Sequence, residues 1–207
     1  MPNHDFFDLR KYLIGNSQSL AVWIVLFSLI IFATFRYDGF ASIYNVSSFL
    51  NYNSIFISIS LGMCFVIMTG GIDLSVGSVA AFTSVVAAYL SPYGIQFALP
   101  IAILAGAAFG AINAFFIIMM RIPPFIATLA TMLGAKGGAL IISGAETIGV
   151  DWGSNFTKLG LEKAFGILPW TILIVLLLAL VLWIILEKTS IGRTVLAIGG
   201  GEEASIL

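Results

Sequence analysis

Residues 69–79, Thr-Gly-Gly-Ile-Asp-Leu-Ser-Val-Gly-Ser-Val, determine how the rest of the chain can fold. They lie in the middle of a long apolar region and are the part of that region least compatible with lipid. Gly70 and Gly71 carry no side chain and weaken a helix, so a helix arriving from Ile55 is expected to end here. Asp73 is ionisable, and a charged side chain at the bilayer centre costs about 2.5–3.5 kcal/mol on insertion scales. We therefore expect Asp73 to face protein or water.

A second helix is expected to begin directly after this acid. Asp73 precedes Leu74-Ser75-Val76, and its carboxylate suits an N-cap that accepts amide protons from a helix running to about Tyr89. The stretch thus predicts a hydrophobic segment broken into two helices around residues 69–75. Such breaks are tolerated only where they are buried in protein or line a cavity, and in transporters they often mark the substrate path. The candidate residues for a helix break or pathway are Gly70, Gly71, Asp73, Ser75 and Gly77.

Two interpretations of Asp73 stay open at this stage. In the first, the carboxylate only satisfies backbone amides inside the helix bundle. In the second, it lines the pathway, since intramembrane acids are functional candidates by default.

The composition places the chain among polytopic membrane proteins. Hydrophobic residues make up 60% of the 207 positions and charged residues 9%, and the mean hydropathy is +1.09, values that soluble domains do not show. The formal net charge of −1 and the lack of a basic tract argue against nucleic-acid binding. Membrane lipid is the expected surrounding.

The sequence lacks the parts of an enzyme. Cys64 is the only cysteine and lies in a predicted span, and His4 is the only histidine and lies in the N-terminal tail. No second acid accompanies Asp73 in the membrane to form a carboxylate pair. We therefore expect no catalytic residue, no metal site and no cofactor.

The pattern predicts an all-α, polytopic transmembrane helix bundle. The two segments beside the break are short of the roughly 20 residues that a full crossing needs, so two full spans and two half-helices both remain possible. Residues 41–53 are rich in Ser, Asn and Tyr and are expected to form an interfacial connection, for which a short helix on the membrane surface is one form. Residues 144–168 are expected to form a polar loop. The six predicted hydrophobic segments are 20–35, 55–69, 75–90, 97–120, 124–143 and 169–186.

Orientation is predicted from the basic residues. One side of the membrane collects five Lys and Arg residues and the other three, which places both termini in the cytoplasm. The expected organisation is a cytoplasmic tail at 1–19, a transmembrane domain at 20–186 and a cytoplasmic tail at 187–207. The two sets are Arg10, Lys11, Arg121, Lys188 and Arg193 against Arg36, Lys158 and Lys163.

Several residues within the spans predict close helix packing. The pairs Gly106/Gly110 and Gly134/Gly138 have the GxxxG spacing that lets a neighbouring helix approach closely. Asn113 is expected to need a partner across a helix interface. Lys136 either reaches the membrane surface or pairs with an acid, for which Asp73 is one candidate.

Three collinear motifs resemble a known family. Residues 66–78 (Val-Ile-Met-Thr-Gly-Gly-Ile-Asp-Leu-Ser-Val-Gly-Ser) resemble the signature of ribose/xylose/galactose-type permease subunits of bacterial ABC importers. Residues 121–129 (Arg-Ile-Pro-Pro-Phe-Ile-Ala-Thr-Leu) are similar to the segment after the central span of that family. Residues 189–200 (Thr-Ser-Ile-Gly-Arg-Thr-Val-Leu-Ala-Ile-Gly-Gly) are similar to its cytoplasmic stretch. The resemblance covers about residues 45–207.

The resemblance implies a multi-pass subunit of the bacterial inner membrane that forms a sugar pathway together with a second permease subunit. A periplasmic solute-binding protein would deliver the sugar and a cytoplasmic ATPase would drive transport. The sequence agrees with this division, because it contains no Gly-x-x-x-x-Gly-Lys-Ser/Thr motif to hold ATP phosphates. By the same resemblance, ATPase docking is implied for Gly192, Arg193, Glu202 and Glu203.

Alternatives to this function remain. One is a secondary transporter or channel driven by an ion gradient, with Asp73 and Lys136 as the coupling pair. Another follows from the family, whose members continue through more membrane helices beyond the position of Leu207. The chain is then the N-terminal part of a permease, expected either to work with the missing spans or to be a non-functional fragment.

Overall fold

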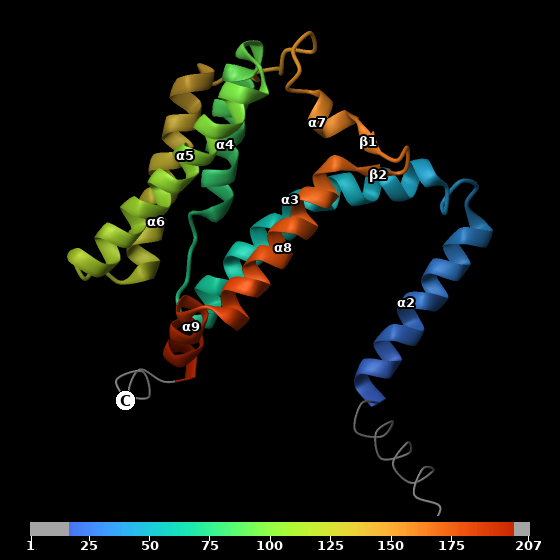
Figure 1. Cartoon of the computed structure of the whole chain (residues 1–207), viewed down its shortest axis with the longest axis horizontal. Helices are drawn as coiled ribbons and strands as arrows, with labels where there is room; N and C mark the ends of the chain where they lie inside the picture. Colours follow the sequence, from blue (N-terminus) through green and yellow to red (C-terminus); the bar gives the residue numbers. More distant parts are fainter. Residues whose placement is uncertain (1–16, 201–207) are drawn as a thin grey trace, which may run out of the picture. The chain divides into compact units, whose positions relative to one another are not determined.

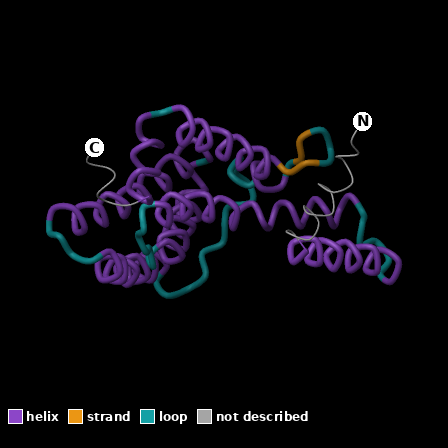
Figure 2. The backbone as a smooth tube through the Cα atoms, turned by 90° about the horizontal axis from the view of Figure 1, so that it is seen from below, coloured by secondary structure: helices purple, strands orange, loops and turns teal. Residues whose placement is uncertain are grey.

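The computed structural model describes residues 17–200 and is almost entirely helical (Figure 2). The chain divides into two compact units, Met1–Phe49 and Leu50–Leu207. The N-terminal tail predicted at 1–19 and the candidate residues Glu202 and Glu203 lie outside the described residues or at their edge.

The first unit contains helix α2, Ser17–Arg36, and the start of helix α3, Ile43–Met68. The Ser42 hydroxyl accepts the Asn45 amide proton at 3.2 Å, and the Asn45 side chain donates to the Phe40 carbonyl at 2.7 Å. This serine therefore behaves as an N-cap. Residues 43–53, predicted as an interfacial connection or a short surface helix, instead form the first turns of the long helix α3, because a capped helix starts twelve residues before Ile55.

Polar side chains inside α3 do not interrupt it, because they bond to the helix backbone. The Ser54 hydroxyl donates to the Asn51 carbonyl at 2.6 Å, and the Ser58 hydroxyl donates to the Ser54 carbonyl at 2.9 Å. Hydroxyls satisfied in this way are tolerated in apolar surroundings. The helix reaches 26 residues, long enough to cross a bilayer.

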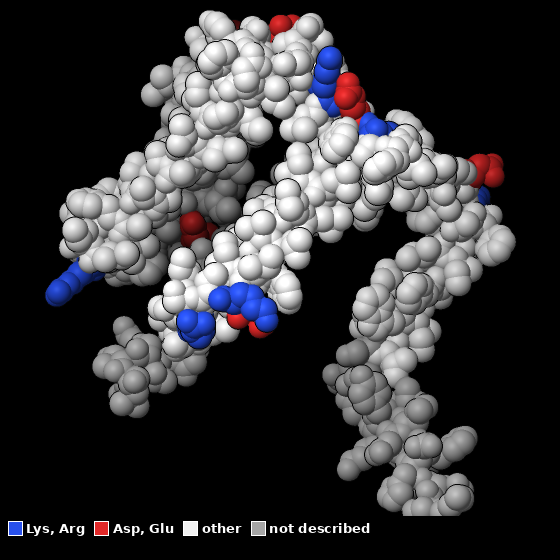
Figure 3. Space-filling model, viewed as in Figure 1, with Lys and Arg blue, Asp and Glu red and all other residues white. Residues whose placement is uncertain are grey.

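Among the described residues, five helices are long and apolar enough to cross a membrane, and α2 contributes a shorter apolar stretch at Leu20–Arg36. The two helices beside the break both qualify, so half-helices are not needed to explain their lengths. Charged side chains are sparse on the visible surface of these helices (Figure 3). The chain is thus an all-α, multi-pass membrane protein. The five spans are Ile43–Met68, Val76–Tyr93, Ile95–Met119, Pro124–Ser143 and Trp170–Lys188.

Helices α4 (Val76–Leu90), α5 (Ile95–Ala114) and α6 (Pro124–Ser143) pack together (Figure 1). Short connections join them, a 3-10 turn at Ser91–Tyr93 and a π-helical turn at Phe115–Met119 followed by four residues. Consecutive helices joined so closely run antiparallel. The start of α4, the end of α5 and the start of α6 therefore lie at the same end of this bundle.

Glycine permits the closest approaches within the bundle. A Cβ atom at Gly106 would lie 3.3 Å from Thr83, and one at Gly138 would lie 2.9 Å from the Phe82 ring. At the other members of the two GxxxG pairs, Gly110 and Gly134, a Cβ atom would meet nothing within 4 Å. One glycine of each predicted pair is therefore the packing residue.

Residues 144–169 connect α6 to α8, Trp170–Lys188, and contain the short helix α7, Lys158–Leu161. Strands β1, Lys163–Ala164, and β2, Leu168–Pro169, form a two-stranded antiparallel hairpin. Asparagine side chains hold this segment to helix ends. Asn51 accepts from the Thr171 hydroxyl at 2.6 Å and donates to the Gly160 carbonyl at 3.2 Å. The segment predicted as a polar loop therefore contains a short helix and a hairpin.

Candidate functional site

The helix break begins at Gly70, as the sequence predicts. Gly70 has a φ of +74°, in the left-handed region where glycine is favoured. Its amide donates to the Ile67 carbonyl at 2.9 Å, and the Gly71 amide donates to the Val66 carbonyl at 3.0 Å. This pair of bonds is a Schellman motif, which satisfies carbonyls at the end of α3. The second glycine of the Gly-Gly pair needs no left-handed conformation but packs closely against Val66.

Residues 71–73 follow without regular structure, and α4 begins at Val76. The prediction that Asp73 is the N-cap of this helix needs correction. Ser75 holds the N-cap position without a side-chain cap bond. Asp73 instead accepts both the Ser75 amide proton at 2.7 Å and the Ser75 hydroxyl proton at 2.6 Å. The carboxylate closes a turn one step before the helix, because its side chain bonds two residues ahead.

Ser75 starts a chain of buried side-chain hydrogen bonds that crosses the bundle. The Asn113 amide group of α5 donates to the Ser75 hydroxyl at 3.0 Å, and the Thr131 hydroxyl of α6 donates to the Asn113 carbonyl oxygen at 2.6 Å. These three side chains are buried. The prediction that Asn113 needs a partner across a helix interface is confirmed. We call Asp73, Ser75, Asn113 and Thr131 the break network.

A second contact joins the break to α6 through its backbone. The Thr128 hydroxyl accepts the Leu74 amide proton at 3.2 Å and donates to the Pro124 carbonyl at 2.8 Å. It also lies 3.5 Å from the Ile72 carbonyl. Thr128 is 2% exposed, so it satisfies the polar backbone of the break where water is scarce.

The break network lies inside the bundle and not at its edge. Asn113 precedes the end of the π-helical turn by six residues, and Thr131 follows the start of α6 by seven. At 1.5 Å per residue, both side chains lie about 10 Å along their helices from the nearest helix end. The segment 71–75 must enter the bundle to that depth to meet them. The polar end of the break, Asp73 to Ser75, thus meets buried groups of α5 and α6, while Ile72 and Leu74 are exposed.

A cavity of about 450 Å³ adjoins the break. Asp73 is half-buried and contributes to its lining together with Thr69, Asn113 and Thr128. A carboxylate, an amide and hydroxyls can exchange hydrogen bonds with a polar solute or with water. The two interpretations of Asp73 are therefore compatible, since the same carboxylate holds Ser75 and borders a cavity.

The remaining predicted residues of the break region lie elsewhere. Gly77 lines a different pocket, between α4 and α6, which also includes Lys136. Since Asp73 lines the cavity at the break and bonds to Ser75, the structure does not bring Asp73 and Lys136 together as a pair.

Two residues of the implied ATPase-docking group belong to helix α9, Ser190–Gly200. Gly192 is buried against the end of α8, where a side chain would meet the Leu186 carbonyl, while Arg193 is exposed. A side chain at Gly199 would meet the Met68 carbonyl, so α9 also touches the last turn of α3 next to the break. Within the tail predicted at 187–207, the structure thus forms a helix at Ser190–Gly200.

Sequence reasoning also missed Thr128 and Thr131. Their spacing of three residues puts both hydroxyls on one face of α6, and that spacing is the signal that could have indicated a polar interface. It is weak by itself, because threonine is common in membrane helices.

One family model and several known proteins match this chain. A family model described as the permease component of the branched-chain amino acid transport system matches residues 45–206. A ribose import permease protein of Haemophilus influenzae is 33% identical over 206 residues, which cover 97% of this chain and 62% of the relative. A ribose import permease protein of Bacillus subtilis is 35% identical over 203 residues, 96% of this chain and 62% of the relative.

A fructose import permease protein of Bifidobacterium longum is 30% identical over 217 residues, which cover 97% of this chain and 61% of the relative. The chain thus spans about three-fifths of the length of these curated relatives. No solved structure matches the chain significantly.

Proposed function

Because the chain belongs to the permease-component family whose model matches residues 45–206, we propose that it forms part of the membrane pathway of an ATP-driven importer. The solute is a sugar or a sugar-like molecule, as the names of the ribose and fructose import permeases indicate for those relatives. The single observation that carries this proposal is the helix break at residues 69–75, whose polar end is hydrogen-bonded to buried side chains of α5 and α6. A chain that only anchors a complex has no need of unpaired backbone and an acid inside its helix bundle.

The break supplies polar groups at membrane depth. Asp73 and Asn113 border the cavity there, and Thr128 satisfies the adjoining backbone. Because the break network joins three segments of the bundle, a shift of one helix changes the hydrogen bonds of the others. A solute gate built on such a network has two discrete arrangements, which is what alternating access requires.

The chain performs no chemistry in this proposal, and ATP hydrolysis belongs to a cytoplasmic ATPase subunit. A periplasmic binding protein supplies the solute, and a second permease subunit completes the pathway in the bacterial inner membrane. The N-terminus and α9 lie on the cytoplasmic side. Exposed Arg193 is available to the ATPase, and the contact of Gly199 with the end of α3 offers a mechanical route from the ATPase to the break.

The proposal predicts uptake that depends on ATP and on Arg193. Cells that produce the chain with its ATPase and binding protein are expected to accumulate labelled D-ribose, and ATP depletion abolishes this uptake while the proton gradient is kept. Arg193→Glu reverses a charge on the proposed docking surface, so it is expected to reduce both uptake and co-purification of the ATPase several-fold. Arg121→Glu is the matched control, because Arg121 is also exposed but lies between α5 and α6.

Uptake that continues without ATP and collapses with the proton or sodium gradient would instead indicate a secondary transporter. Equal loss of ATPase binding in the Arg121 and Arg193 variants would contradict docking at α9.

A further inference from the structure

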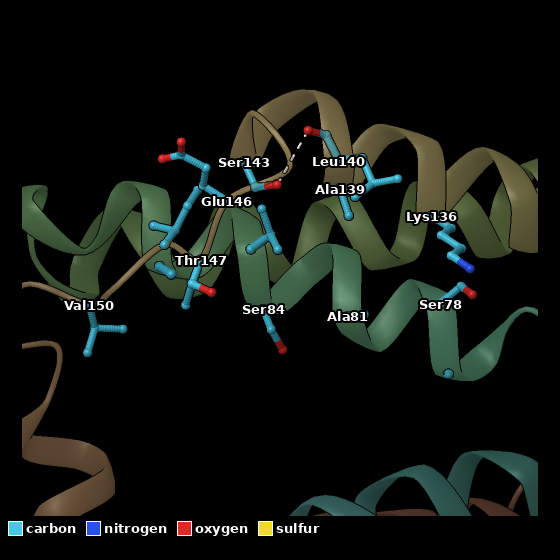
Figure 4. Close-up of a pocket in the computed structure, with 14 residues that line it drawn as sticks. Ser78, Ala81, Ser84, Lys136, Ala139, Leu140, Ser143, Glu146, Thr147 and Val150 are labelled. Carbon is cyan, nitrogen blue, oxygen red and sulfur yellow. Dashed lines mark hydrogen bonds between the residues drawn. The ribbon is translucent and has the colours of Figure 1, made fainter.

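A second hollow, lined mostly by apolar side chains with a few polar ones, lies between α4 and α6 (Figure 4). Its volume is about 690 Å³, larger than one monosaccharide. Along α4 it begins at Gly77 and Ser78, two and three residues after Ser75 of the break network. It then passes Ser84 and Ser143 and continues beyond the last turn of α6, past Glu146 to Val150. We call this hollow the α4–α6 groove.

Lys136 is the residue that does not fit a lipid-facing surface. It lies on α6 about 18 Å from the start of the helix and about 10 Å from its end, at 1.5 Å per residue. A lysine near the bilayer centre costs about 2.5–3.5 kcal/mol on insertion scales unless it reaches water or a partner. Within residues 17–200, the Lys136 ammonium makes no hydrogen bond or ion pair that would offset this cost.

The direction of the Lys136 side chain excludes the simplest way of lowering this free-energy cost. A lysine can lower its cost by extending toward the nearer membrane surface. Figure 4 shows the Lys136 side chain extending toward the Ser78 end of the groove, away from Glu146 and the end of α6. Helical side chains incline toward the N-terminus of their helix, so this direction is the ordinary one for α6. The ammonium thus points deeper, and the groove itself must supply its polar surroundings.

The groove offers the complementary chemistry for a neutral, hydroxyl-rich solute. An ammonium donates up to three hydrogen bonds, and serine hydroxyls donate and accept. The other groove positions on α4 are alanine, valine or glycine, which leave room for a ligand. The one acid of the lining, Glu146, lies beyond the last turn of α6 and not beside Lys136.

We propose that the α4–α6 groove is filled with water and that its lining forms one wall of the solute pathway. Lys136 and Ser78 are the hydrogen-bonding partners of a neutral sugar there, and the break network lies at the end of the groove nearest Gly77. This inference rests on the proposed function for the identity of the solute. The aqueous nature of the groove stands independently, because it follows from the position of Lys136 in α6.

Cysteine labelling tests the proposal on the full chain in membranes. Single cysteines are placed in a Cys64→Ser background, at Ser78 and Ser143 in the groove and at Ile141 and Leu104 as controls on exposed apolar surface. Ile141 is 83% exposed and lies two residues from Ser143, so it matches that position in depth. The probe is a membrane-impermeant, positively charged methanethiosulfonate, which reacts with thiolate in water.

Because thiolate forms in water and not in lipid, labelling is expected to be about tenfold or more faster at the two groove positions than at the controls. Labelled Ser78→Cys is expected to lose D-ribose uptake, and treated Leu104→Cys to keep it. Equal or absent labelling at all four positions overturns the aqueous groove. Fast labelling at Ser78→Cys without loss of an existing uptake overturns its role as the solute path. If no variant takes up D-ribose before labelling, the proposed function fails, and the labelling rates still decide whether the groove is aqueous.

Discussion

Replacing Gly138 by leucine is expected to lower the unfolding free energy of the helix bundle by about 1–3 kcal/mol, the usual cost of overpacking a fitted core. Even a Cβ atom at this position would lie 2.9 Å from the Phe82 ring. That ring cannot retreat freely, because it also meets Phe109 of α5 with ring centroids 5.1 Å apart. The leucine must therefore push α6 away from α4.

Gly134→Leu is the matched control for this variant. It lies one turn earlier on α6, belongs to the same GxxxG pair and would place its Cβ atom with nothing within 4 Å. Thermal unfolding of the purified protein in detergent compares the two substitutions at equal change in volume and helix propensity. Equal destabilisation would show that α6 does not pack on α4 through Gly138.

Replacing Asn113 by leucine is expected to lower the unfolding free energy by about 1–2 kcal/mol, since interhelical hydrogen bonds in membranes contribute modestly and two are lost here. The leucine leaves the Ser75 and Thr131 hydroxyls without their Asn113 partners in a buried setting. Leaving buried polar groups unpaired is costly. The loss is measured by denaturation of the protein in mixed detergent micelles.

A double-mutant cycle with Thr131→Val supplies the control for Asn113→Leu. If the two side chains bond as the structure shows, the double variant loses less stability than the sum of the single variants. Strict additivity of the two losses would contradict the break network. Ser84→Ala is a further reference, because the Ser84 hydroxyl donates to its own helix at the Ala80 carbonyl.

The helix break and the need of Asn113 for a partner could be predicted from the sequence, because the residues involved are unfavourable in an undisturbed membrane helix. Two adjacent glycines, an acid in an apolar run and an asparagine in a span all conflict with an undisturbed membrane helix. The structure confirms that α3 ends just before Gly70 and that Asn113 has a partner on another segment. The predicted N-cap at Asp73 is too early, because a carboxylate that bonds two residues ahead and one that caps a helix have the same sequence pattern.

Other features depend on contacts that a sequence does not display. The Ser- and Asn-rich start of α3 resembles a surface connection, since hydropathy counts a hydroxyl as polar even when the helix backbone satisfies it. The roles of Thr128 and Thr131 depend on the segments to which they are hydrogen-bonded. The groove around Lys136 likewise becomes visible only when α4 and α6 lie beside each other.

If the helix is broken and the break network holds the break in the bundle, the backbone amides at the break should differ in hydrogen exchange from those of the flanking helices. Within the described part of the chain, the Ile72 and Asp73 amides donate no hydrogen bond, whereas amides in the middle of α3 and α4 are bonded within their helices. Amide hydrogen exchange reports such local differences. The decisive experiment is therefore hydrogen–deuterium exchange of the protein in lipid nanodiscs.

A peptide covering residues 69–76 is expected to exchange much faster than peptides covering 58–66 and 80–88, and Asn113→Leu is expected to accelerate it further without changing the other two. Protection of residues 69–76 equal to that of both neighbouring helices would mean that the helix continues through Asp73, and the helix break would then not exist.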